Sequence, residues 1–165
     1  MNASLQPIRL QPIGQVVNGC ERPPADGWDN VVSEIVLRPG LEKHFIGLDK
    51  FSHAYVLYWM HVDTARLQEQ ALVHPQGRKD LPLVGVFATH SPCRPNPIGV
   101  TVVKLLQVSP LCLQVQGLDA LDGSPVLDIK SFAGTAGLPI ANSCPTWVQA
   151  LRLPKESLPA NEGHR

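Results

Sequence analysis

The chain has 165 residues with 14 basic and 14 acidic side chains, so its formal net charge is zero. Its length suffices for one domain with its own core, and 44% apolar with 17% charged residues excludes a disordered chain. No apolar run reaches the roughly 18 residues of a membrane span. Balanced charge argues against tight, autonomous binding to nucleic acid, because phosphate neutralisation usually supplies most of that affinity.

The first residues show no basic segment followed by an apolar stretch, which predicts a cytoplasmic protein rather than a secreted one. The four cysteines lie far apart and form no Cys-x-x-Cys pair. Zinc requires clustered cysteine, histidine or carboxylate ligands, so we expect no metal site. We likewise expect no membrane partner.

Short extended segments, separated by proline and glycine, dominate the chain. Many short strands with such punctuation predict a mainly β fold, either a sandwich or a barrel. The predicted strands are Ile8–Val17, Val31–Leu37, His53–Val62, Val84–Ala88, Gly99–Gln107, Leu111–Gln116 and Pro125–Ile129.

One segment, Thr64–Val73, is rich in strong helix formers and predicts a short helical excursion between the third and fourth strands. It belongs to a long connection, and long connections in compact domains are often binding loops. Beyond Phe132 the chain becomes irregular. We therefore expect one β domain over residues 1–132 and an irregular C-terminal extension over residues 133–165.

Both faces of the third predicted strand are largely apolar. Tyr55 and Trp59 lie on one face, and Val56 and Met60 on the other. A strand that is apolar on both sides is usually covered on both sides. A second subunit would provide such a cover, and so would a loop of the same chain.

Two long motifs carry a resemblance to a known family. Gly85–Gly99 reads GVFATHSPCRPNPIG, and Gly117–Lys130 reads GLDALDGSPVLDIK. With the upstream segments Gln11–Gly14 and Gly47–His53, they resemble the TsaA-like (YaeB-like) family over about residues 8–132. Its characterised members are S-adenosylmethionine-dependent methyltransferases that modify N6 of threonylcarbamoyladenosine in tRNA. The resemblance implies a single-domain small β-barrel that forms a homodimer, uses S-adenosylmethionine and acts on tRNA.

The resemblance also implies which residues contact the cofactor. They are His61, His90, Val100, Asp119, Ala120, Leu121 and Asp122. The carboxylates of the acidic turn suit ribose hydroxyls or an ammonium group, and its backbone suits an adenine edge. The same five residues, Asp-Ala-Leu-Asp-Gly, also fit a simple hairpin turn in which aspartate bonds to the local backbone.

Three further side chains are candidates for ligand contact. Pro95 and Pro97 stiffen their loop and can aim Arg94 and Asn96 at a substrate phosphate or carboxylate. Alternatively, these two side chains bond to carbonyl groups of the loop. Trp28 suits packing against the cofactor's adenine or sulfonium, or it anchors the chain ahead of the second strand.

The sequence does not decide which molecule accepts the methyl group or which residue removes the proton. The family usually has arginine where this chain has His90, which replaces a permanent cation by a titratable imidazole. His90, Asp122 and Asp128 are candidates for the general base, although we expect Asp128 to pair with a cationic side chain. The same fold and cofactor also fit a methyltransferase of small molecules, or a protein that binds S-adenosylmethionine without turnover.

Overall fold

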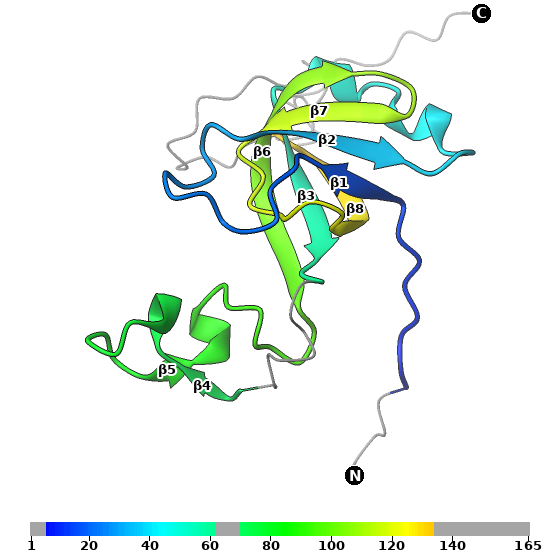
Figure 1. Cartoon of the computed structure of the whole chain (residues 1–165). Coiled ribbons are helices and arrows are strands. Elements are labelled where there is room, and N and C mark those ends of the chain that lie inside the picture. The colour runs from blue at the N-terminus through cyan, green and yellow to red at the C-terminus, as the bar shows by residue number, and fades with distance from the viewer. Residues whose placement is uncertain (1–5, 62–69, 134–165) are drawn as a thin grey trace, which may run out of the picture.

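The computed structural model describes residues 6–61 and 70–133, and its centre is a closed antiparallel β-barrel (Figure 1). The strands follow one another around the barrel in the order β1-β2-β7-β6-β3-β8. Their bounds are β1 Gly14–Val17, β2 Val32–Leu37, β3 His53–Trp59, β6 Ile98–Val108, β7 Cys112–Gln116 and β8 Pro125–Phe132. A separate sheet pairs β4 Leu72–Val73 with β5 Val84–Gly85. The short 3-10 helices are η1 Glu42–Phe45, η2 Leu48–Lys50, η3 Pro75–Gly77 and η4 Val86–Ala88.

Alternating side chains build the barrel core. In β2, Ser33, Ile35 and Leu37 are buried while the residues between them are exposed. In β3, every second residue from Ala54 to Tyr58 is buried, and the residues between them are half-buried. β-Branched side chains pack well on such a pleated, half-buried surface. The predicted mainly β barrel is therefore confirmed, with most of its strands within three residues of their predicted ends.

β1 closes the barrel because it pairs with both β2 and β8. Gly14 lies opposite Leu37, and a Cβ at Gly14 would lie 2.3 Å from the carbonyl oxygen of Val36. Only glycine permits this approach of two backbones. The predicted start of the strand at Ile8 is wrong, since β1 begins at Gly14; Pro12 has no N–H to donate to a ladder.

The described residues 70–97, which precede β6, extend away from the barrel at the end where β3 finishes and β6 begins (Figure 1). The predicted helix Thr64–Val73 is wrong at its end, because Leu72–Val73 form β4 paired with β5. Its residues 64–69 lie outside the described part of the chain.

The predicted barrel strand Val84–Ala88 is also wrong. β5 has two residues and leads into η4 outside the barrel. The reason is local: the N–H and the hydroxyl group of Thr89 both donate to the carbonyl oxygen of Val86, at 3.1 and 2.8 Å, and close a turn.

The outer face of β3 is partly covered within the chain. Tyr55 packs edge-to-face on Phe132 with ring centroids 5.1 Å apart, while Leu57 and Trp59 are half-buried. The homodimer stays a prediction. Residues 134–165 of the predicted C-terminal extension lie outside the described ranges, and no helix within those ranges is long and apolar enough to span a bilayer.

Candidate functional site

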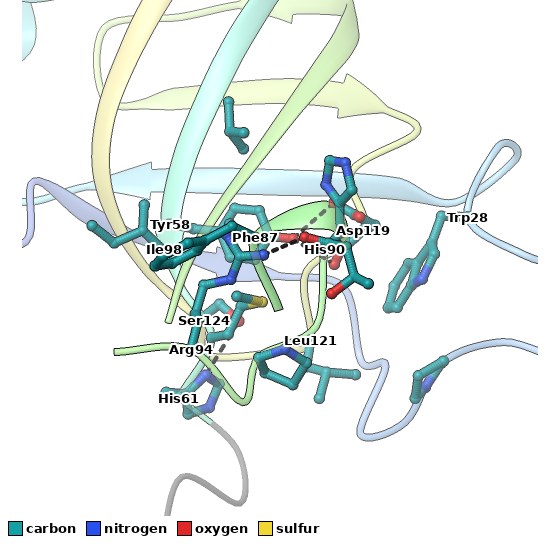
Figure 2. Close-up of a pocket in the computed structure, with 16 residues that line it drawn as sticks. Trp28, Tyr58, His61, Phe87, His90, Arg94, Ile98, Asp119, Leu121 and Ser124 are labelled. Carbon is teal, nitrogen blue, oxygen red and sulfur yellow. Dashed lines mark hydrogen bonds between the residues drawn. The ribbon is translucent and has the colours of Figure 1, made fainter. Parts of the chain in front are cut away.

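A cavity of about 390 Å³ opens where β3 ends and β6 begins (Figure 2). Its other walls come from the loop after β1, the loop between η4 and β6, and the connection between β7 and β8. Small-molecule sites typically have volumes of about 300–1,000 Å³ and apolar walls with a few polar groups. This cavity fits that description.

The cavity brings together most of the residues singled out by sequence. Its lining includes Trp28, His61, His90, Arg94, Val100, Asp119 and Leu121. The proline-rich loop and the acidic turn thus converge on one pocket. The N–H group of Met60 donates to the carbonyl oxygen of Pro97 at 2.8 Å, which fastens the end of that loop beside β3. Ala120, Asp122 and Asn96 lie outside the lining.

Asp119 lies at the rim of the cavity, and one of its two carboxylate oxygens accepts hydrogen bonds from side chains of the barrel. Its Oδ1 accepts a hydrogen bond from the Thr101 hydroxyl group, and the Tyr58 hydroxyl lies 2.8 Å from both Oδ1 and the Asp119 carbonyl oxygen. Burial, followed by the nearby Asp119 charge, raises the pKa of Tyr58, so the phenol stays protonated as a donor. Within the described residues no hydrogen bond to Oδ2 is present, which leaves this oxygen for a ligand.

Gly99 allows Tyr58 to reach Asp119. A Cβ at Gly99 would lie 2.3 Å from Cζ of Tyr58, inside the ring's own volume. The pair faces across the β3–β6 ladder, where Tyr58 and Gly99 are register partners. The sequence analysis did not identify Tyr58, Gly99 or Thr101 as site residues. Tyr58 could have been found, because its hydroxyl group is the polar atom on a strand face that is otherwise apolar.

Asp122 has a structural role at the same turn. Its Oδ1 accepts hydrogen bonds from the N–H groups of Asn18 at 2.7 Å and Gly19 at 2.9 Å, and these bonds lower its pKa. The carboxylate fastens the loop after β1 to the acidic turn. A carboxylate of low pKa that already accepts two hydrogen bonds is a weak base. Of the three candidates for the general base, His90 lines the cavity, whereas Asp122 and Asp128 do not.

The proline-rich loop is braced by its own arginine. Arg94 Nε donates to the carbonyl oxygen of Ser91 at 2.8 Å, and Nη2 donates to the carbonyls of Thr89 and Val86. Of the two roles considered for Arg94, the structure therefore shows hydrogen bonds to carbonyl groups of its own loop. Asn96 lies instead in a neighbouring groove beside Trp59.

Two further polar contacts involve residues singled out by sequence, His61 at the floor of the cavity and Asp128 outside its lining. His61 Nδ1 lies 3.2 Å from the hydroxyl of the buried Ser124. Asp128 Oδ2 lies 2.5 Å from Lys130 Nζ, which confirms the expected ion pair. The described residues contain no cluster of histidine, cysteine, aspartate and glutamate that could hold a metal ion.

Two aromatic residues face the opening. Trp28 is half-buried in the loop after β1, whereas Phe87 of η4 has 80% of its surface exposed. In the view of Figure 2 they lie on different sides of Asp119. The sequence did not predict Phe87 as a site residue, because Val84–Ala88 was expected to be a strand, whereas Phe87 lies in η4 at the cavity.

Fold and site together define a small β-barrel protein with a ligand-sized pocket between an acidic turn and a proline-rich loop. Residues 18–136 match the family model described as the tRNA-methyltransferase O N-terminal domain. The chain therefore belongs to this family, which confirms the resemblance inferred from the two motifs.

Individual relatives agree with this assignment. A probable S-adenosyl-L-methionine-binding protein of Methanothermobacter thermautotrophicus is 41% identical over 76% of this chain and 90% of its own length. The tRNA (adenine(37)-N6)-methyltransferase of Mus musculus is 42% identical over 55% of this chain, but this chain spans only 21% of it. The crystal structure of TrmO from Pseudomonas aeruginosa aligns with a TM-score of 0.62 at 26% identity, covering 82% of this chain and 61% of that one.

Proposed function

We propose that the chain transfers a methyl group from S-adenosylmethionine to N6 of an adenosine in tRNA, with threonylcarbamoyladenosine as the acceptor. Family membership assigns the S-adenosylmethionine-dependent methyltransferase class. The observation that carries the proposal is the convergence of the acidic turn and the proline-rich loop on one cavity. A cytoplasmic location and a homodimer belong to the same proposal, the dimer supported by the apolar, partly exposed outer face of β3.

The residues of the cavity fit the cofactor chemically. Leu121, Met60 and Ile98 provide apolar walls for a nucleoside. Oδ2 of Asp119, which accepts no hydrogen bond from the described residues, suits a ribose hydroxyl or an ammonium group as hydrogen-bond donor. Trp28 presents an aromatic face, which attracts a sulfonium cation.

S-Adenosylmethionine, when bound, supplies a methyl group on a sulfonium whose sulfur leaves as a neutral thioether with the bonding electron pair. The chain's own task is to align the acceptor nitrogen with that methyl group and to exclude water. As the new N–C bond forms, the acceptor nitrogen must release a proton. We assign its acceptance to His90, because this exposed side chain lines the cavity and a ring nitrogen of imidazole can accept a proton.

Zero net charge favours one alternative, a small-molecule acceptor, because such a substrate needs no phosphate contacts. A binding protein without turnover is the other alternative; the Methanothermobacter relative is described as a probable S-adenosyl-L-methionine-binding protein. The three functions share the cofactor pocket and differ in whether a methyl group reaches tRNA.

The test is to incubate the purified chain with methyl-labelled S-adenosylmethionine and tRNA taken from cells that lack the protein. Mass spectrometry of the digested nucleosides then reads the product. We expect threonylcarbamoyladenosine to gain one methyl group. Label on unmodified adenosine would correct the acceptor, and cofactor binding without labelled tRNA would reject the tRNA function.

A matched pair of variants connects this activity with the cavity. Leu121→Trp fills the cavity from its wall, whereas Leu106→Trp enlarges an exposed side chain outside the lining. We expect the first variant to lose methylation and the second to retain it.

A further inference from the structure

We propose that Phe87 is the platform on which the acceptor base stacks when it enters the pocket. The inference rests on the proposed function and extends it to the side chain that selects an unpaired nucleobase. Phe87 lines the cavity, yet 80% of its surface is exposed. Burying a phenylalanine stabilises a fold by roughly 1.5–3 kcal/mol, and this ring gains little of that stabilisation within its own chain.

The backbone beneath the ring is firmly held. Val86 is buried, and its N–H group donates to the carbonyl oxygen of Ala71 at 3.0 Å. Its carbonyl oxygen accepts bonds from the N–H and hydroxyl groups of Thr89 and from Arg94 Nη2. An exposed ring on an anchored turn is preorganised for a ligand, because little ordering remains when the ligand binds.

The high exposure of Phe87 indicates that its ring contacts the acceptor base rather than the cofactor. The floor of the pocket is made of buried groups, including Tyr58 at 3% and Ser124 at 2% exposure. Small-molecule sites bury most of their ligand, so the cofactor belongs at this floor. Phe87 lies at the opening, where a base that has left its stack would arrive first.

If the acceptor is an RNA base, the charge of the chain requires a means of holding it that does not depend on phosphate contacts. With 14 basic and 14 acidic residues, the protein has no cationic surplus for holding phosphates. Arg94, the cation in the lining, is already bonded to carbonyls of its loop. Stacking on an aromatic side chain needs no charge and accepts any base, since every base has a π-face.

The test measures steady-state methylation, by Phe87→Ala, of an anticodon stem-loop RNA that carries threonylcarbamoyladenosine, with cofactor affinity measured by calorimetry. Loss of one stacked base predicts an increase in KM for the RNA of roughly 5- to 150-fold, with unchanged affinity for S-adenosylmethionine. Phe87→Tyr and Phe87→Trp restore the low KM, whereas Phe87→Leu does not. Ile46→Ala is the matched control, since Ile46 is 81% exposed and lies outside this cavity.

An unchanged KM in Phe87→Ala, or full rescue by leucine, would overturn the inference while leaving the methyltransferase function intact. Weaker binding of the cofactor in Phe87→Ala would place the ring against the cofactor and would also overturn it. A wild-type chain that binds the cofactor but methylates no RNA would reject the proposed function itself.

Discussion

Replacing Gly99 by alanine tests whether the barrel interior positions Asp119 for cofactor binding. The new Cβ would lie 2.3 Å from Cζ and 2.6 Å from Cε2 of Tyr58. Tyr58 is 3% exposed, so its ring can move only by disturbing the core. Overpacking of this kind costs about 1–3 kcal/mol, which corresponds to a decrease in Tm of roughly 2–12 °C for a chain of this size.

The shift also separates the Tyr58 hydroxyl from Asp119, where it lies 2.8 Å from Oδ1. A hydrogen bond contributes about 0.5–1.5 kcal/mol net, and water can replace part of it because Asp119 is exposed. We therefore expect affinity for S-adenosylmethionine to fall about 2- to 13-fold in Gly99→Ala. Isothermal titration calorimetry measures the affinity, and differential scanning calorimetry measures Tm.

Two variants separate the steric effect from the lost hydrogen bond. Tyr58→Phe removes the hydroxyl without a clash, so it should lose affinity with a smaller change in Tm. Gly85→Ala serves as the matched glycine control, because nothing lies within 4 Å of a Cβ there. The reasoning is refuted if Gly99→Ala binds the cofactor as tightly as the wild type, or if it is no less stable than Gly85→Ala.

Three further predictions concern loops and barrel closure. Because N–H groups of Asn18 and Gly19 lower the pKa of Asp122, its stabilising effect is present above the ordinary carboxyl pKa of about 3.9 and is lost as pH falls through the lower folded value. Asp122→Asn should therefore have a lower Tm than the wild type at pH 6, with the gap closing under acid; a gap independent of pH would contradict this. Arg94→Ala and Arg94→Lys should both accelerate amide hydrogen exchange over residues 86–97, because neither side chain spans several carbonyls; full protection in the lysine variant would show that charge alone suffices. Gly14→Ala should lower Tm, since its Cβ meets backbone at 2.3 Å; an unchanged Tm would mean that β1 does not close the barrel as described.

The sequence predicted most of the barrel strands well because residues that favour strands are dense in them, and proline and glycine separate one strand from the next. Which side chains point into the core was less visible: in Val32–Leu37 the polar Ser33 is buried, while the apolar Val32 and Val36 are exposed. The short strands β4 and β5 have two residues each, too few for any period. Their pairing is decided by contacts between Leu72–Val73 and Val84–Gly85, which override the helix propensity of the first segment.

The two motifs located the pocket, but they left out the contacts that shape it. Tyr58 reaches Asp119 across 61 positions of sequence, through a register in which Gly99 faces Tyr58. A register between distant strands cannot be read from local pattern. Likewise, the direction of the Arg94 guanidinium follows from the folded loop, where carbonyls of residues 86, 89 and 91 surround it.

The most direct measurement is a crystal structure of the chain with S-adenosylhomocysteine, the demethylated cofactor. We predict density in the pocket beside Leu121, with a polar group of the ligand on Oδ2 of Asp119 and the ring of Phe87 still open to solvent. Density in the separate cavity lined by Phe45 and Phe51, or stacked directly on Phe87 with the floor empty, would contradict the account.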